Sequence, residues 1–441
     1  MVLSAIMKPQ TAAAASRGVA WRAVAVLLLF YALAMVDRQV LFLLVGPIRK
    51  DLGATDFQVG LLQGLSFAVS FCLFGLPFGY AVDRVSRRLV VFVGVMVWAA
   101  ATTASGFASS YGELFAARIL VGAGEAALGP AAFSMLSDLF PPKKLTFALS
   151  IYSMGSLVGN ALAFALSGWV IGLTQAAETA LFGLRSWQAV FLIVGTPGLL
   201  IAFCIFLVPE PTRRGHRGIQ ASWPDLFAFI RLRRRFFICH LGGFSCMMTI
   251  AYANLAWGPT FLVRHFGWSI PQVGATLSVY SLLLGIFCFL FSGKMVEWLQ
   301  NRGYEDAHLR YYAVGSLITT LAGASAFQAP NAVIYLCIAA FGALFVNLAA
   351  IAPAALQIVT PGELRGRVSA IYLLVTGLIG MTAGPALVSG ITQFIFADDN
   401  RVNDSLSITY LIVGPLACVF FAFGLRPMRE ARALRMADDV A

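Results

Sequence analysis

The chain has 441 residues, of which 59% are apolar and only 12% are charged, and its mean hydropathy is +0.83. A water-soluble globular chain is about 45–50% apolar and about 25% charged. So few charged side chains cannot cover the surface of a soluble particle. A soluble protein is therefore excluded, and lipid is the expected solvent.

The basic character of the chain does not indicate a nucleic-acid partner. The net charge is +11, but the basic residues lie in short loops between apolar runs rather than on one soluble face. The seven cysteines show no CxxC or Cys/His ligand spacing. We therefore expect neither a metal site nor a disulfide framework.

Apolar runs of about 20 residues, the length that crosses a hydrocarbon core of about 30 Å as a helix, recur along the whole chain. The first run continues through Asp37 and Arg38, which makes it too long and too charged for a cleaved signal. We expect twelve membrane-spanning helices, at 20–45, 57–81, 89–108, 113–138, 145–173, 187–208, 236–262, 271–296, 311–328, 331–359, 367–395 and 406–425.

The basic residues predict the orientation. If both termini are cytoplasmic, the inside loops hold most of the lysines and arginines, which agrees with the positive-inside rule. The outside set then contains only Arg49, Lys50, Arg185, Arg264 and Arg401.

A long basic connection divides the predicted spans into two groups of six. Landmarks such as Pro141 and Pro361 recur at matching places in the two groups, and a repeat of two six-helix halves is typical of transporters. The expected segments are a cytoplasmic tail (1–19), an N-terminal bundle (20–208), a basic linker (209–235), a C-terminal bundle (236–425) and a cytoplasmic tail (426–441).

The loop after the second predicted span has the pattern G-x-x-x-D-R-x-S-R-R. It fits an ordinary positive-inside loop, or a gate in which the acid pairs with cations or a helix N-terminus to lock the inner face. The pattern resembles the signature loop of the major facilitator superfamily. We call it the gate motif and take as its functional residues Gly79, Asp83, Arg84, Arg87 and Arg88.

Charged residues inside two predicted spans form the strongest candidate site. Arg118 and Glu125 are seven residues apart, so they lie on one face of a helix, about 10 Å apart in depth. Asp37 and Arg38 lie at a comparable depth in the first span, so an Asp37–Arg118 contact is expected. Such charges face a partner or a wet cavity. They are either static ion pairs that fix the helices or groups that load and release a proton.

Several motifs together resemble the spinster-type branch of the superfamily: Asp37-Arg38, Gln58 to Gly64, Gly122 to Ala126, and Ser137-Asp138. This resemblance implies proton-linked movement of lysolipids, with Asp37 and Glu125 as the proton-coupling pair. Arg38 and Arg118 would organise that pair or meet an anionic headgroup. An Asp-Arg pair in the first span is also similar to organic-anion symporters, so the substrate stays open.

Polar or amphipathic residues in other spans are candidates for lining the cavity. Each fits an interhelical hydrogen bond as well as a substrate contact. They are Ser153, Asn160, Tyr252, Asn254, Trp257, Tyr280, Asn347, Gln357 and Tyr372.

We therefore predict an all-α membrane protein with twelve transmembrane helices in two pseudo-symmetric six-helix bundles. Its expected function is proton-coupled, alternating-access transport of a lysolipid-like solute. An organic-anion/proton symporter and a non-transporting receptor are the alternatives. No nucleotide loop, nucleophile–base pair or metal cluster is visible, so we expect no enzyme and no cofactor, with a proton gradient as the coupling source. The expected partners are the substrate, protons and the bilayer, for a monomer in a bacterial inner membrane.

Overall fold

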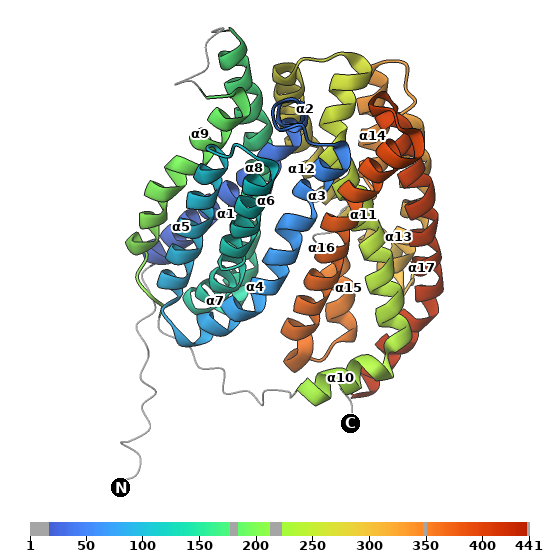
Figure 1. Ribbon diagram of the computed structural model, residues 1–441. Coiled ribbons are helices and arrows are strands. Elements are labelled where there is room, and N and C mark those ends of the chain that lie inside the picture. The colour runs from blue at the N-terminus through green and yellow to red at the C-terminus, as the bar shows by residue number, and fades with distance from the viewer. Residues whose placement is uncertain (1–16, 177–183, 212–222, 347–350, 439–441) are drawn as a thin grey trace, which may run out of the picture.

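The computed structural model describes residues 17–176, 184–211, 223–346 and 351–438, and over these ranges the chain is built of helices (Figure 1). Two groups of helices stand side by side and form an N-terminal and a C-terminal half. Helix α1 (Arg17–Leu43) begins and α17 (Val402–Asp438) ends at the same end of the molecule, at the bottom of Figure 1. We call that end the termini side and the opposite end the far side.

The N-terminal half contains the first nine helices. After α1, the elements are α2 (Val45–Leu52), α3 (Asp56–Gln63), α4 (Leu65–Arg84), α5 (Arg87–Ser105), α6 (Tyr111–Glu125), α7 (Leu128–Leu139), α8 (Pro142–Ala176) and α9 (Ser186–Ile201), followed by a 3-10 turn (Ala202–Leu207).

The C-terminal half begins with a short helix, α10, on the termini side. The elements are α10 (Trp223–Leu232), α11 (Arg234–Phe266), α12 (Ile270–Asn301), α13 (Ala307–Ala326), α14 (Ala332–Ala343), α15 (Ile351–Val359) and α16 (Arg365–Gly390), then a π turn (Ile391–Phe396) and α17. The two halves meet where α8 packs against α12 and α3 packs against α16.

The arrangement confirms the predicted helical membrane fold. Among the described residues, ten helical segments are long and apolar enough to cross a membrane. Helix α13 and the consecutive pair α14 and α15 occupy the remaining two positions, expected at 311–328 and 331–359. The helices also exceed the predicted bounds, because α17 continues to Asp438 without a break and α10 lies within the expected linker.

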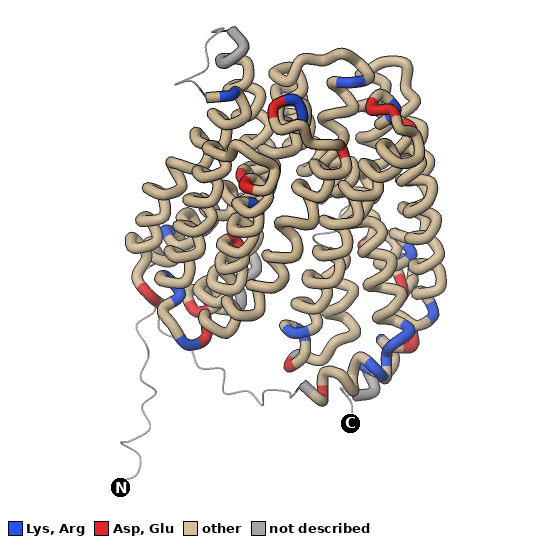
Figure 2. The backbone as a smooth tube through the Cα atoms, viewed as in Figure 1, with Lys and Arg blue, Asp and Glu red and all other residues tan. Residues whose placement is uncertain are grey.

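The surface agrees with a lipid environment. Large apolar side chains point outward, among them Leu200, which is 74% exposed, and Phe423, which is 73% exposed. Figure 2 shows that the charged residues gather at the two ends of the helices, with a few inside the N-terminal half. Since exposed apolar surface of this extent is unfavourable in water, hydrocarbon is the medium that suits it.

Two spanning helices are interrupted near the middle of the N-terminal half. The second span is interrupted at Gly64, between α3 and α4, and the fourth between α6 and α7. Gln63 and Glu125 are the last residues before these interruptions. Discontinuous membrane helices commonly place polar groups at a transporter's binding site.

Glycines bring α6 close to its neighbours. A Cβ atom on Gly122 would lie 2.6 Å from the carbonyl oxygen of Phe67 in α4, and one on Gly124 would lie 2.7 Å from the carbonyl oxygen of Gly94 in α5. Both distances are too short for a side chain, so only glycine allows this packing. The G-x-G pattern on α6 therefore serves helix packing, and it fixes the helix that carries Arg118 and Glu125.

Gly124→Ala should lower the melting temperature of the protein in detergent, because the added methyl group meets the α5 backbone, which cannot move aside. Overpacking of this kind costs about 1–3 kcal/mol. The matched control is Gly75→Ala, since a Cβ atom at Gly75 has no neighbour within 4 Å. Tryptophan fluorescence during heating measures both variants. Equal melting temperatures would show that the α5–α6 contact is not tightly packed.

Candidate functional site

Four charged side chains from α1 and α6 meet inside the N-terminal half. Asp37 is 3% exposed, Arg118 is 1% exposed and Glu125 is 2% exposed. Arg38 donates a hydrogen bond from Nε to Oε2 of Glu125 at 2.5 Å, and Arg118 donates from Nη1 to the main-chain carbonyl of Asp37 at 2.9 Å. The Asp37–Arg118 contact is thus made by the backbone oxygen. We call these four residues the charge cluster.

Aromatic rings hold the two arginines in place. The guanidinium of Arg38 lies 4.6 Å from the ring centre of Phe67 and 4.7 Å from that of Phe71, and Arg118 lies 5.8 Å from Phe67. A single charged side chain at the centre of a bilayer costs about 2.5–3.5 kcal/mol. Two acids and two bases in contact offset that cost by pairing.

The pairing within the charge cluster is incomplete. Among the described residues, no hydrogen-bond partner reaches Oδ1 of Asp37, Oε1 of Glu125 or Nε of Arg118. Buried polar atoms without partners are rare, and each one in a native structure calls for an explanation. The cluster can therefore bind a proton, or form further hydrogen bonds with water or a solute.

A cavity of about 30 Å³ lies beside the charge cluster. The N-terminal half lines it with the polar residues Arg38, Gln39, Gln63 and Arg118 and with the apolar residues Met35, Phe42 and Phe67. The C-terminal half contributes Tyr252 from α11 and Met381 from α16. The charged lining residues therefore all come from the N-terminal half, and apolar side chains from both halves lie beside them.

The predicted cavity residues have different surroundings. Tyr252 lines the cavity, and Asn160 has a buried side-chain oxygen with no partner in the described ranges. Ser153 and Gln357 are exposed, and Asn254 is partly buried. Asn347 lies outside the described residues.

The other three predicted aromatic residues serve packing contacts. Trp257 donates to the carbonyl of Pro385 at 3.1 Å, and Tyr280 donates to the carbonyl of Leu336 at 3.0 Å. Tyr372 is buried, with its ring 6.1 Å from that of Phe244.

The gate motif lies on the termini side, between α4 and α5. Arg87 is fully buried: its side chain forms an ion pair with Asp138 at the end of α7 and another with Glu210 at 2.9 Å. Arg88 donates to the carbonyl of Val208 at 3.2 Å. These contacts join α5, α7 and the end of the sixth span, so they make the N-terminal half rigid at this end.

The other motif residues are more open. Asp83 is exposed in the last turn of α4, and Arg84 lies over the Tyr80 ring with its guanidinium 3.4 Å from the ring centre. A Cβ atom at Gly79 would have no neighbour within 4 Å. In this state the glycine is therefore not in close contact with another helix.

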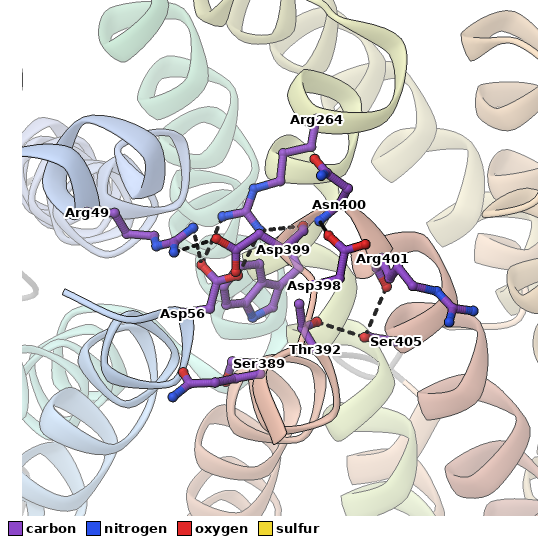
Figure 3. A network of polar contacts seen from close by, with 12 residues as sticks. Arg49, Asp56, Arg264, Ser389, Thr392, Asp398, Asp399, Asn400, Arg401 and Ser405 are labelled. Atoms are coloured by element: carbon purple, nitrogen blue, oxygen red, sulfur yellow. Dashed lines mark hydrogen bonds and ion pairs between the residues drawn. The ribbon is translucent and has the colours of Figure 1, made fainter. Parts of the chain in front are cut away.

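An ionic network on the far side joins the two halves (Figure 3). Arg264 of α11 holds Asp56 of α3 through two hydrogen bonds of 2.7 and 2.9 Å. Arg49 of α2 contacts Asp56 at 3.0 Å and reaches across to Asp399 at 2.6 Å. We call Arg49, Asp56, Arg264 and Asp399 the latch.

Burial and hydrogen bonds hold the latch residues in place on both halves. The side chain of Asp56 is fully buried, in the first turn of α3, where the helix dipole favours a negative charge. On the other half, hydrogen bonds from Thr392 to Ser405 and from Ser405 to the carbonyl of Arg401 hold the turn that carries Asp399. The latch therefore closes the far side by joining the start of α3 to the turn that carries Asp399.

The chain matches the sequence profile of the Major Facilitator Superfamily over residues 27–431. It belongs to that superfamily.

Its relatives in the superfamily are transporters. Protein spinster of Drosophila melanogaster is 28% identical over 391 residues, which are 85% of this chain and 62% of that protein, so the chain spans less than two thirds of that relative. The D-galactonate transporter of Escherichia coli is 25% identical over 81% of this chain and 86% of its own length. The chain is thus a transporter related to spinster and sugar-acid transporters, and not an enzyme.

Solved structures show the same fold. A bacterial homolog of the human lysosomal transporter Spinster, solved in an inward-facing and unoccupied conformation, superposes with a TM-score of 0.79 at 23% identity. The superposition covers 94% of this chain and 98% of the other.

Sequence reasoning missed several partners in this transporter. The latch acid Asp56 follows Thr55 and has the pattern of an ordinary helix start, and Glu210 lies at the start of the long basic connection. Gln39 and Gln63 are single amides in apolar runs and could have been found by that feature. The contacts of Asp56 and Glu210 join segments distant in sequence, so no local pattern reveals them.

Arg264→Ala should open the far side more often, because Asp56 loses its bidentate partner from the opposite half. The reporter is a single cysteine at Ser389, which is buried, in a background without the seven native cysteines. Maleimide labelling should become several-fold faster. The control is Arg185→Ala, since Arg185 contacts Asp51 within one half. Unchanged labelling of the Arg264 variant would exclude the latch as a closing device.

Glu210 should make the termini side sensitive to acid. Partial burial alone would raise the pKa of Glu210. Hydrogen bonds from Ser86 and Arg87 outweigh that effect and hold the pKa of Glu210 below its ordinary value. A carboxylate with a lowered pKa stabilises the fold at pH values above its unfolded pKa, about 4.3, and loses that effect as the pH falls through the folded pKa.

The wild type should therefore melt at a higher temperature than Glu210→Gln at neutral pH. This difference should stay constant down to about pH 5 and shrink below about pH 4.3. Melting curves at a series of pH values measure it. A difference that persists unchanged into strong acid would mean that the charge of Glu210 is not responsible.

Proposed function

We propose that this chain is a proton-coupled secondary transporter that moves a lysolipid-like solute across the membrane by alternating access. The observation that carries the proposal is the charge cluster. It places two buried carboxyl groups beside two arginines and leaves an oxygen of each carboxyl group without a partner in the described part of the chain. Buried acids in membrane helices commonly mark proton pathways.

The proposed coupling follows from charge balance. With Glu125 ionised, Arg38 is held by its carboxylate at 2.5 Å. When Glu125 takes up a proton, this ion pair becomes a weaker neutral contact, and the Arg38 guanidinium is available to an anionic solute. Loss of the proton restores the pair and favours release. Asp37, whose backbone holds Arg118, is the second proton site of the proposal.

The proposed orientation places the termini side in the cytoplasm of a bacterial inner membrane. The excess of arginine and lysine in the loops on that side supports this orientation. The latch then closes the outer side, and the two halves rock about the charge cluster. The proposed transporter acts as a monomer, needs no cofactor and uses the proton gradient as its coupling source.

The lysolipid part of the proposal rests on the mixed polar and apolar lining of the cavity. Arginine and glutamine side chains suit a charged headgroup, whereas Met381 and Tyr252 suit the start of a tail. An apolar groove of about 540 Å³ between α8 and α12, with Trp169 and Leu173 in its wall, offers a surface for an acyl chain.

A small organic anion is the second candidate. The cavity of about 30 Å³ has room for a small group only, and the D-galactonate transporter of Escherichia coli is among the relatives. This candidate uses the same charge cluster, so it differs from the first in the substrate alone.

Uptake of a labelled lysophospholipid into proteoliposomes, with and without a pH gradient, tests the proposal. Flux above protein-free vesicles that rises with the gradient is the expected result. Gradient-driven uptake of a sugar acid without lysolipid flux would favour the second candidate. No flux of either solute by folded, inserted protein would overturn the proposed function.

Glu125→Gln should abolish gradient-driven accumulation and leave solute binding measurable, because glutamine keeps the shape of the side chain but cannot take up the proton. The measurement is uptake at a series of imposed pH gradients. Glu113→Gln is the control, since Glu113 is an exposed acid on the same helix. A Glu125 variant that responds to the gradient like the wild type would make Glu125 a structural residue.

A further inference from the structure

Two glutamine side chains beside the charge cluster are buried and incompletely paired. Gln39 of α1 is 5% exposed and Gln63 of α3 is 6% exposed. Within the described ranges, no partner reaches Oε1 of Gln39 or either Oε1 or Nε2 of Gln63. Since a buried amide without hydrogen bonds is costly, this arrangement needs an occupant or another reason to persist.

The position of Gln63 is fixed at the boundary between the halves. It ends α3, directly before the interruption at Gly64. A Cβ atom on Gly64 would lie 2.3 Å from the carbonyl oxygen of Met381 in α16, so the backbone here touches the opposite half. The amide of Gln63 therefore stands where both halves can close around a solute.

Both amides line the same cavity as Arg118. Its volume of about 30 Å³ is enough for one water molecule or one hydroxyl group, since about 10–15 Å³ in this measure holds a water. An amide oxygen accepts a hydrogen bond and an amide nitrogen donates two, whereas a hydroxyl group both donates and accepts. A water molecule or a hydroxyl group of a solute can therefore use both functions of Gln63, and of these two only the hydroxyl group belongs to a transported molecule.

The adjacent arginine adds a second requirement. Nε of Arg118 has no hydrogen-bond partner among the described residues, and a guanidinium donates most strongly to a carboxylate or phosphate oxygen. The amides and this donor share one cavity wall. A group that satisfies all of them is an oxyanion with a hydroxyl on a nearby carbon.

We propose that Gln39 and Gln63 form a hydroxyl-binding subsite beside Arg118, and that the transported solute is an oxyanion that carries a free hydroxyl group. This inference rests on the proposed function and specifies its substrate. Two kinds of solute share this chemistry: a lysophospholipid, whose glycerol keeps a free hydroxyl next to the phosphodiester, and a free hydroxy acid such as a sugar acid.

The subsite has a consequence for specificity. A site built to hydrogen-bond a hydroxyl group rejects the analogue that lacks it, because the buried amides then remain unpaired. One such group with neutral partners should give a preference of about tenfold in affinity. Leucine at position 63 has nearly the volume of glutamine but no hydrogen-bonding atoms, so it should remove the preference.

The experiment measures equilibrium binding to the purified full chain with two pairs of solutes. The first pair is a lysophosphatidylcholine and its 2-deoxy analogue, and the second is gluconate and hexanoate. The wild type should bind the hydroxylated member of at least one pair about tenfold more tightly. Gln63→Leu should bind both members of that pair equally. The control Gln300→Leu, at an exposed glutamine near the end of α12, should retain the preference.

The outcomes separate this inference from the proposed function. Binding of lysolipids with no preference for the hydroxyl in either pair, or a preference that survives in Gln63→Leu, overturns the subsite and leaves the lysolipid transporter standing. A preference for gluconate over hexanoate, with no binding of either lysolipid, supports the subsite and overturns the lysolipid substrate. No binding of either pair overturns both. If Gln63→Leu does not fold, the wild-type preference alone decides.

Discussion

The ion pair between Arg38 and Glu125 is the interaction on which the rest of this structure depends. A charge within a membrane is tolerated only when it is paired or faces a wet cavity, so these two residues fix how α1 and α6 must meet. The glycines at 122 and 124 then allow α6 to pack closely enough against α4 and α5. The glycines thus allow the close packing of α6, and the ion pair joins α6 to α1.

The same requirement for pairing has a different result at each end of the molecule. On the termini side, Arg87 pairs with Asp138 and Glu210 within one half, which makes that half a rigid unit. On the far side, Arg264 and Asp56 pair across the halves. Rigid halves with an ionic contact between them suit alternating access, because a few bonds at the boundary can break without disturbing either helix bundle.

Much of the fold could be predicted because the membrane imposes it. Long apolar runs must become helices where the backbone has no other hydrogen-bond partners, and the predicted spans agree with the helices found. The cluster residues were visible because charges interrupt those runs at Asp37 and Arg118. The backbone contact of Arg118 and the amide pair Gln39 and Gln63 were not predicted, since helix rotation and tilt decide which neutral side chains share a cavity.

The sequence by itself determined the solvent of this protein, its spanning helices, its family resemblance and the identity of its buried charges, because each of these follows from local composition and spacing. Only the tertiary structure decided which charges meet. The few arginines predicted to lie outside looked alike in the sequence, yet Arg264 forms an ion pair with Asp56 of the other half, whereas Arg185 contacts Asp51 of its own half. The physical reason is that an ion pair forms over a few ångströms in space, and only the packing of the helices brings residues 208 positions apart to that distance.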